Sequence, residues 1–273
     1  MSRLNRREAL TMLAASATSL VRAETAPFHV DGLDHVALTV PAPGKSGAFY
    51  RQIFSPIMIR GDAGPRAIVG DRKYIAINSA GAAQQKASVD HIALTIDGYQ
   101  RESVKAQLAK LGIPVKDGAG QDLFVTDPDG IRIQLIGPGS VDALPREPNL
   151  PNVDPIFQPT GFDHVLLDVS NPEKSSTFYE KLLGPVTQRN NNRTWFQVGK
   201  SRLGLLGDAS QRGGGVNHFC VSAAAFAYDA VLKKLEQAGA KVEDPEVAGA
   251  PEFRDPDGIL VQVMGPRAAT GKK

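Results

Sequence analysis

The sequence predicts an α+β fold in which one unit, a strand followed by a helix and about three further strands, occurs four times. Two observations lead to this prediction. Four strand-like runs open with the same histidine, and these account for four of the five histidines of the chain: His35, His91, His164 and His218. Two of the runs are followed by the same phrase, Asp-Pro-Asp-Gly, at residues 127–130 and 255–258. The repeated phrases indicate an internal duplication.

The spacings support duplication. His35 and His164 are 129 residues apart, His91 and His218 are 127 apart, and Gln134 and Gln262 are 128 apart. Within each half, the two histidines are separated by 56 and 54 residues. Fixed periods of this kind are typical of repeated supersecondary units. The chain therefore divides into two similar halves, each made of two modules of roughly 50 residues.

The first half begins with a strand over Leu33–Val40, whose residues alternate and include valine and threonine. A helix over Lys45–Phe54 follows a proline-glycine break, and a strand is expected over Arg72–Asn78. The second module repeats this plan with a helix over Tyr99–Leu111, which ends before Gly112, a residue favoured just past helix C-termini. Its closing strand runs through Gln134 after an Asp-Pro-Asp-Gly turn.

The second half repeats this order. Its helix phrase Thr177-Phe178-Tyr179-Glu180 matches Ala48-Phe49-Tyr50-Arg51 of the first half. The expected elements are strands over Phe162–Val169, Thr194–Val198 and Arg202–Leu206, helices over Pro172–Leu183 and Ala225–Ala238, and a closing strand through Gln262.

The pattern defines the organisation of the chain. Six prolines between residues 137 and 160 are incompatible with a helix or sheet interior. We expect an export signal over residues 1–23, a first domain over 30–138, a proline-rich linker over 139–160, a second domain over 161–266 and a flexible tail over 267–273.

Composition restricts the class of protein. The chain is 42% hydrophobic and 22% charged, as in ordinary soluble globular proteins, and 273 residues suffice for two cores. Cys220 is the one cysteine, which excludes an internal disulfide and a thiolate-clustered zinc site.

The N-terminus resembles a twin-arginine export signal. Arg6-Arg7 precede a mildly apolar run over Leu10–Val21 and the small-residue cleavage pattern Val21-Arg22-Ala23. The alternative is an amphipathic helix that stays attached. The run is too short for a retained membrane span. Cleavage after Ala23 leaves 27 basic and 28 acidic residues, a net charge of −1. We therefore expect an exported, periplasmic protein that binds neither nucleic acid nor, in its mature form, a membrane.

Together, the modules, the opening aspartate-histidine strands, the phenylalanine-tyrosine helices and the Asp-Pro-Asp-Gly turns resemble the vicinal oxygen chelate superfamily, which includes glyoxalases, bleomycin-resistance proteins and extradiol dioxygenases. The resemblance covers nearly the whole mature chain. It implies four βαβββ modules paired into two cupped-sheet domains, with a divalent metal on a concave face. The implied ligand sets are His164, His218 and Gln262, and His35, His91 and Gln134.

Strand parity indicates the same face independently. Alternate residues of a strand share a side, so the histidines lie opposite Val36, Leu38 and Val40 and their equivalents, which form a natural packing surface. The histidine side is therefore the cavity side. Its other members include three candidate substrate-binding residues: Arg132, Asp168 and Cys220. Arg132 would place a cation in the first cavity, whereas Leu260 makes the second more apolar; we therefore expect the first to prefer anionic ligands.

Gln134 and Gln262 depart from the family pattern, which has glutamate at these positions. An amide removes the negative charge that partly neutralises a divalent ion, so metal affinity should fall. Two histidines and a glutamine oxygen could still hold zinc, nickel, manganese or iron with open positions. The alternative is that these residues only hydrogen-bond across a polar cavity.

Three functions then compete: a glyoxalase-type lyase or isomerase, an extradiol dioxygenase, and a metal-free binding protein of the bleomycin-resistance type. The missing glutamates weaken the first, and the absence of a further histidine between His164 and His218 weakens the second. We expect a metal-dependent enzyme acting on a small oxygen-rich molecule, with the binding protein as the alternative. The sequence does not identify the catalytic residues of such an enzyme. It also leaves open whether the modules pair within one chain or between the chains of a homodimer.

Overall fold

The computed structural model describes residues 28–266 except 56, 62–63, 82–85, 140, 143, 147–152, 191 and 208–213. The expected export signal, the tail and part of the linker lie outside the described residues. None of the helices in the described ranges is long and apolar enough to cross a membrane.

The described elements occur as four repeats of strand, helix and three strands, so the predicted fold class is confirmed. The first half contains β1 (Val30–Val40), α1 (Pro43–Ile53), β2 (Met58–Gly61), β3 (Gly64–Gly70), β4 (Lys73–Ser79), β5 (Ser88–Ile96), α2 (Arg101–Lys110), β6 (Val115–Asp117), β7 (Leu123–Thr126) and β8 (Arg132–Ile136). The second contains β9 (Pro159–Val169), α3 (Pro172–Leu183), β10 (Gln188–Asn190), β11 (Arg193–Val198), β12 (Ser201–Gly207), β13 (Gly215–Ala223), α4 (Tyr228–Gln237), β14 (Lys241–Glu243), β15 (Glu252–Arg254) and β16 (Leu260–Met264).

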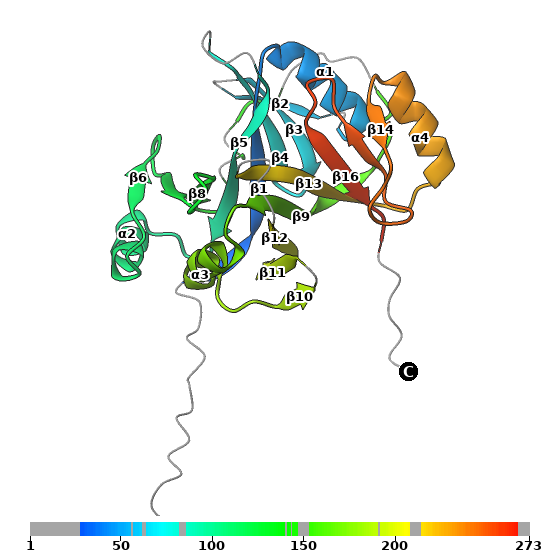
Figure 1. Cartoon of the computed structure of the whole chain (residues 1–273). Helices are drawn as coiled ribbons and strands as arrows, with labels where there is room; N and C mark the ends of the chain where they lie inside the picture. The colour runs from blue at the N-terminus through cyan, green and yellow to red at the C-terminus, as the bar shows by residue number, and fades with distance from the viewer. Residues whose placement is uncertain are drawn as a thin grey trace, which may run out of the picture.

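Each half forms one eight-stranded sheet (Figure 1). The orders are β2-β3-β4-β1-β5-β8-β7-β6 and β10-β11-β12-β9-β13-β16-β15-β14. The first strands of the two modules pair antiparallel at the centre of each sheet, β1 with β5 and β9 with β13. The histidine-bearing strands are therefore neighbours within each half.

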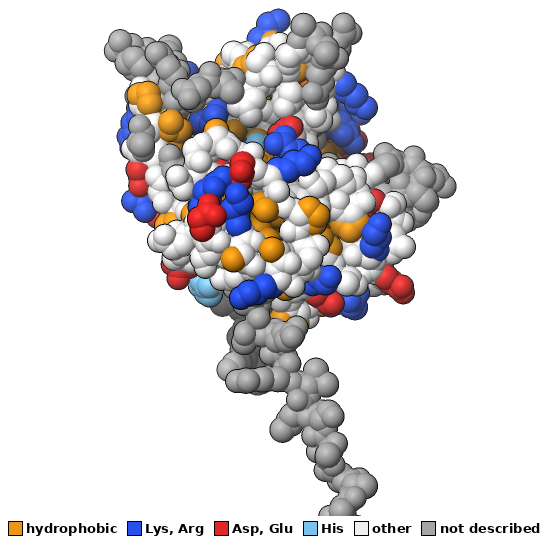
Figure 2. Space-filling view, turned by 90° about the vertical axis from the view of Figure 1, so that its left-hand side faces the viewer, with side chains coloured by type: hydrophobic (Ala, Val, Ile, Leu, Met, Phe, Trp, Pro, Cys, Tyr) orange, Lys and Arg blue, Asp and Glu red, His pale blue; other side chains and the backbone are white. Residues whose placement is uncertain are grey.

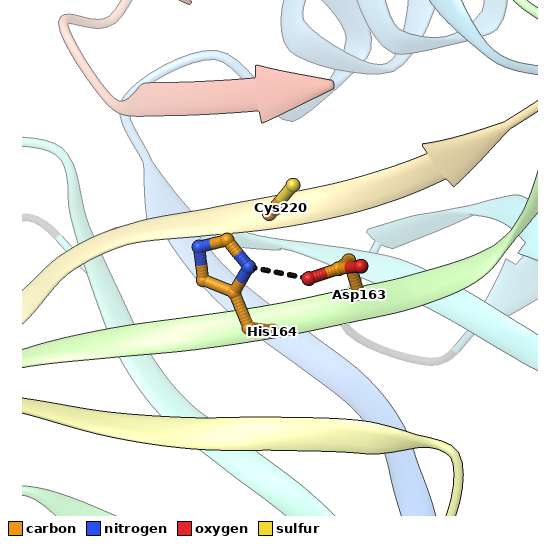
Figure 3. Close-up of side chains that lie close together, drawn as sticks. All are labelled: Asp163, His164 and Cys220. Carbon is orange, nitrogen blue, oxygen red and sulfur yellow. Dashed lines mark hydrogen bonds and ion pairs between the residues drawn. The ribbon is translucent and has the colours of Figure 1, made fainter. Parts of the chain in front are cut away.

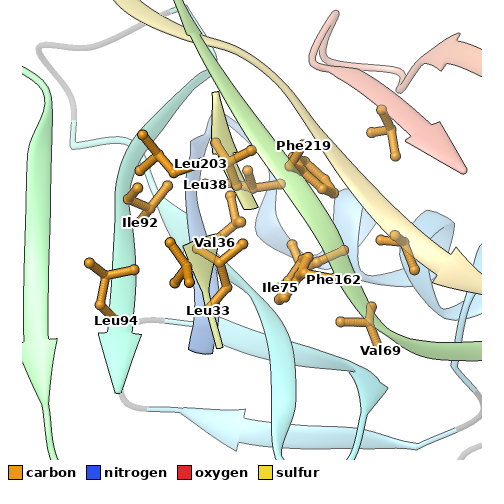
Figure 4. Close-up of a cluster of buried hydrophobic side chains, with 14 of the residues drawn as sticks. Leu33, Val36, Leu38, Val69, Ile75, Ile92, Leu94, Phe162, Leu203 and Phe219 are labelled. Atoms are coloured by element: carbon orange, nitrogen blue, oxygen red, sulfur yellow. The ribbon is translucent and has the colours of Figure 1, made fainter. Parts of the chain in front are cut away.

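The face opposite the histidines forms the core, as strand parity predicts. Val36, Leu38 and Val40 are fully buried, and they belong to one apolar cluster that also includes Phe162 and Phe219 of the second half (Figure 4). Burial of this surface is the main stabilising contribution to the fold. The cluster is continuous between the halves, so they pack as one body.

Helices α1 and α3 pack across the halves, which the sequence did not predict. In Figure 1, α1 lies beside the fourth module and α3 beside the second. The Tyr50 hydroxyl donates to Asp255 Oδ2 at 2.7 Å, and the Tyr179 hydroxyl donates to Asp127 Oδ2 at 3.1 Å. The tyrosine of each half therefore binds the Asp-Pro-Asp-Gly turn of the other half.

Two pairs of equivalent glycines allow the sheets to approach closely. A Cβ at Gly70 would lie 2.8 Å from the backbone of Gly161, and one at Gly199 would lie 1.7 Å from the carbonyl oxygen of Asp31, next to Gly32. Gly199 also has a φ of +56°, which side chains rarely adopt. These contacts join the two halves along β3 and β9, and at the bridge between Gly32 and Gly199.

Helix α4 begins at Tyr228 rather than at the predicted Ala225. Ala227, the residue before the helix, is extended, and Phe226 packs edge-on against Phe157, with ring centroids 5.1 Å apart. Phe157 comes from the proline-rich segment and is buried, so the described end of that segment packs on the protein rather than spanning a gap.

On the face of the molecule shown in Figure 2, lysine and arginine side chains are interspersed with aspartate and glutamate.

Candidate metal sites

The sheet order brings each expected ligand set together. In the first half, His35, Ala93 and Gln134 stand in register across β1, β5 and β8. In the second, His164, Cys220 and Gln262 stand in register across β9, β13 and β16. His91 and His218 lie two residues before the middle members and so share their face. The six predicted ligands therefore form two equivalent clusters.

The imidazoles of each cluster face one another through Nε2. The distance between these atoms is 3.3 Å for His35 and His91 and 3.0 Å for His164 and His218. Each Nδ1 has an oxygen partner supplied by the preceding residue: Asp34 at 2.8 Å, Asp90 at 2.6 Å, Asp163 at 2.7 Å and Asn217 at 2.9 Å.

These partners determine the tautomers. An ionised carboxylate only accepts hydrogen bonds, so Nδ1 of His35, His91 and His164 carries the proton. Asn217 could present either its oxygen or its amide nitrogen, but Nδ2 donates to both carboxylate oxygens of Asp168, at 3.0 and 3.1 Å. Its oxygen therefore faces His218, whose Nδ1 carries the proton as well. Asp168, predicted to bind substrate, acts here through Asn217 on a candidate ligand.

With Nδ1 protonated, all four Nε2 atoms present lone pairs, and the two in each cluster point at one another. This arrangement is unfavourable unless a cation lies between them. The metal–nitrogen distance of about 2.0–2.1 Å for zinc places two adjacent ligands about 3.0–3.4 Å apart, which matches the observed separations. Among the described residues, the buried Oε1 atoms of Gln134 and Gln262 have no hydrogen-bond partner. Each half therefore brings together two imidazole nitrogens and an amide oxygen that could bind one divalent metal.

Burial favours the neutral form of His35 and of His218. It lowers the pKa of His35, opposed by the hydrogen bond that Nδ1 donates to Asp34. It lowers the pKa of His218 to about 3, and the neighbouring His164 and Arg193 lower it further. Neutral imidazole is the form that binds metal, so a lowered pKa reduces the competition of protons for His35 and His218.

Two carboxylates beside the glutamines, the half-buried Asp122 and the buried Glu252, were missed by sequence reasoning. Asp122 accepts a hydrogen bond from Gln134 Nε2 at 2.7 Å, which directs the Gln134 oxygen away from Asp122. Glu252 stands directly opposite Gln262 on the neighbouring strand and is 5% exposed. Burial raises the pKa of both carboxyl groups. Glu252 lies on the strand that precedes the ligand strand and pairs with it in a hairpin. A carboxylate in that preceding strand is the sequence signal that could have identified it.

The sequence predicts a cationic first cavity and a more apolar second one, but both ligand sets have an arginine nearby that is paired with an aspartate. Arg132 is 44% exposed and is bound to Asp90 at 2.7 Å, so its charge is already paired. In the second half, Arg202 is bound to Asp163 at 3.0 Å and lies over Trp195, whose ring contacts His164 edge-on. The second site is therefore not the less charged one. The preference of the first for anions stays a prediction.

Asp163, His164 and Cys220 lie close together and offer a second combination of potential ligands (Figure 3). Figure 3 shows the His164 nitrogen that faces this group bound to Asp163, and this nitrogen is Nδ1. Because Nδ1 carries a proton there, it has no lone pair for a metal. Cys220 is fully buried behind the imidazole. The Nε2 side is therefore the better candidate for metal binding.

The geometry can be compared with known proteins. A sequence model of the Glyoxalase/Bleomycin resistance protein/Dioxygenase superfamily matches residues 161–263. Curated protein sequences give no match. Similar solved structures include the 2,3-dioxygenase LapB from Pseudomonas sp. KL28, at 16% identity and a TM-score of 0.65, covering 89% of this chain and 94% of that one.

Two further structures are similar. Homoprotocatechuate 2,3-dioxygenase from Brevibacterium fuscum, in complex with 3,4-dihydroxyphenylacetate, has 16% identity and a TM-score of 0.68, with coverage of 90% of this chain and 84% of that one. A Mn(II)-bound glyoxalase from Novosphingobium aromaticivorans has 16% identity and a TM-score of 0.64, with coverage of 87% and 83%. At these identities the likeness shows the fold.

The sequence match covers the second half, and the structural likeness covers both. The expected resemblance is therefore confirmed at this level: residues 161–263 match the sequence model of the Glyoxalase/Bleomycin resistance protein/Dioxygenase superfamily, and both halves share the fold of these dioxygenases and this glyoxalase.

Proposed function

We propose that the protein is a divalent-metal enzyme whose working site is formed by His164, His218 and Gln262. The observation that carries this proposal is the 3.0 Å contact between two Nε2 atoms whose Nδ1 partners are both acceptors. A metal-free binding protein would leave these lone pairs opposed. The second half is favoured because it also carries the family's sequence match.

The substrate is a small molecule that offers two adjacent oxygens. Three protein ligands leave coordination positions open for such a pair. A bound divalent metal would supply a Lewis acid that polarises a substrate oxygen. The residues around the ligands hold them in place: Asp163 and Asn217 fix the imidazoles, and Arg202 holds Asp163. The dioxygenases and the glyoxalase with similar folds support this substrate class.

Of the two reaction types, the lyase or isomerase is the better supported. The residue pattern of extradiol dioxygenases includes a further histidine and a tyrosine that act as acid and base. The second half has no histidine besides His164 and His218. A polarographic assay with a panel of catechols separates the two, because oxygen consumption by the metal-loaded protein would contradict this choice.

Metal analysis tests the proposal itself. The wild type and the variants His164→Ala/His218→Ala and His35→Ala/His91→Ala are stripped of metal, reconstituted separately with zinc, nickel, manganese or iron, and dialysed before elemental analysis. We expect the first pair of substitutions to remove one equivalent of metal together with any activity. Wild type that retains none of the four metals would instead support the metal-free binding protein.

We also propose that the protein is exported by a twin-arginine route, on the basis of Arg6-Arg7 and the following apolar run.

A further inference from the structure

Glu252 occupies an unusual position for a carboxylate. It lies on β15 directly opposite Gln262 on β16, in an antiparallel pair. Residues in such a pair project from the same face, with Cβ atoms about 4.5–5.5 Å apart. The side chain of Glu252 thus projects from the face that carries the second ligand set, where the Gln262 oxygen has no hydrogen-bond partner among the described residues.

The surroundings do not compensate the charge of Glu252. Its one hydrogen bond in the described part of the chain comes from the backbone N–H of Glu246, at 3.2 Å. No described lysine or arginine forms an ion pair with it, and the nearby Arg193 is bound to Glu246 instead. An unpaired buried carboxylate is costly unless a cation or a hydrogen-bond network stabilises it. Packing alone therefore gives no reason for a glutamate at this position.

Duplication does not explain Glu252 either. The equivalent residue of the first half, which stands opposite Gln134, is Phe124. The carboxylate of the first half comes from Asp122 instead, whose own equivalent is the buried Ala250. Each half therefore combines a glutamine in the ligand set with a neighbouring carboxylate, half-buried in the first half and buried in the second, but the carboxylates come from different positions. Their shared feature is the neighbouring glutamine rather than a common origin.

We propose that Glu252 supplies the negative charge that Gln262 lacks, so that the second site holds its divalent metal with a carboxylate from the neighbouring strand. This inference rests on the proposed function because it requires a metal at the second site. The carboxylate lost from the ligand strand is thereby replaced one strand away, where it balances the metal's charge without occupying the position of the Gln262 oxygen.

The test measures zinc affinity by competition titration in a His35→Ala/His91→Ala background, in which the second ligand set is intact and the first is removed. Glu252→Gln keeps the volume and the acceptor for the Glu246 N–H but removes the charge. We expect it to weaken zinc binding by about 10- to 100-fold, while the melting temperature of the metal-free protein stays the same or rises. The double variant Glu252→Gln/Gln262→Glu returns the charge to the ligand strand and should restore the affinity.

Glu243→Gln is the matched control, because Glu243 pairs with Glu252 one strand further from Gln262. It should leave the zinc affinity unchanged. Equal affinity of Glu252→Gln and its background would overturn the inference while leaving the proposed function intact. A Glu252→Gln protein that does not fold would overturn it too, since the role of Glu252 would then be structural. If the background itself binds no zinc, both the inference and the proposed function fail.

Discussion

At the scale of single residues, the decisive groups are the hydrogen-bond acceptors behind the imidazoles. Three aspartates and one asparagine place the proton on Nδ1, so the lone pair of each ring lies on Nε2. In metalloproteins, a hydrogen-bond acceptor on the ring nitrogen that does not bind the metal fixes the orientation and tautomer of a metal-binding histidine. Asn217 differs from the other three because a neutral amide needs Asp168 to define which end faces the ring.

Asp168 should therefore control metal affinity without touching the metal. Asp168→Leu frees the Asn217 amide to turn its nitrogen toward His218, which can then no longer keep its proton on Nδ1. We expect zinc affinity at the second site to fall by about tenfold or more. Asp168→Asn retains an acceptor and serves as the control. Equal affinities of the leucine and asparagine variants would show that the orientation of Asn217 does not matter.

The pKa of His218 predicts how the stability of the metal-free protein varies with pH. Burial lowers this pKa to about 3 in the folded protein, against 6.5 for the free side chain. Between these values the unfolded chain binds a proton at His218 that the folded protein does not bind. The free energy of unfolding should thus decrease as the pH falls, by about 2 kcal/mol between pH 7 and pH 5 from this residue.

Denaturant unfolding of the metal-free protein at the two pH values measures this effect. His218→Gln removes the titrating group, so its loss of stability on acidification should be smaller than that of the wild type. A variant that loses as much stability as the wild type would exclude His218 as the source.

At the scale of elements, the duplicated motifs act on one another across the halves. The first aspartate of each Asp-Pro-Asp-Gly turn uses Oδ1 to accept two backbone N–H groups of its own turn and Oδ2 to accept the tyrosine hydroxyl. A second contact of the same kind joins Ser46 to Asp257 at 2.5 Å, and Ser175 to Asp129 at 3.2 Å. These repeated bonds position α1 and α3 and thereby the relative orientation of the two sheets.

Removal of one hydroxyl should destabilise the whole protein. Tyr50 and Asp255 are both buried, so Tyr50→Phe leaves the Asp255 oxygen without its donor. We expect the free energy of unfolding to fall by about 1–3 kcal/mol, with a similar value for Tyr179→Phe. Chemical denaturation followed by circular dichroism measures the loss. A single cooperative transition should persist in both variants; separate unfolding of the halves would contradict the continuous core.

At the scale of the molecule, the two halves are alike in fold and different in what surrounds each ligand set. Tyr74 stacks on His35, and the residue in the same register against His164 is Arg202. On the neighbouring strands β3 and β11 the order is reversed: the first half has Arg66 where the second half has Trp195. On these two strands, each half thus has one aromatic residue and one arginine at equivalent positions, in opposite order. The surroundings of the two ligand sets therefore differ in where charge and aromatic surface lie.

The location of the protein tests the interpretation of its N-terminus. Replacement of Arg6 and Arg7 by lysine should retain the full-length protein in the cytoplasm, because twin-arginine routes recognise the arginine pair. Cell fractionation and N-terminal sequencing measure the outcome, and the wild type should begin near Glu24. Normal export of the double lysine variant would contradict the proposal.

The sequence alone determined the four-module α+β fold, because strand alternation and helix periodicity repeat at fixed offsets. Strand period 2 also places each histidine opposite a run of aliphatic core residues, and the family resemblance implies the two candidate ligand sets. Only the tertiary structure decided what lies beside those ligands. Glu252 reaches Gln262 through strand pairing, Asp168 acts through Asn217, and Tyr50 meets Asp255 over 205 residues of sequence. Such contacts depend on register and on the packing of one half against the other, which no local pattern encodes.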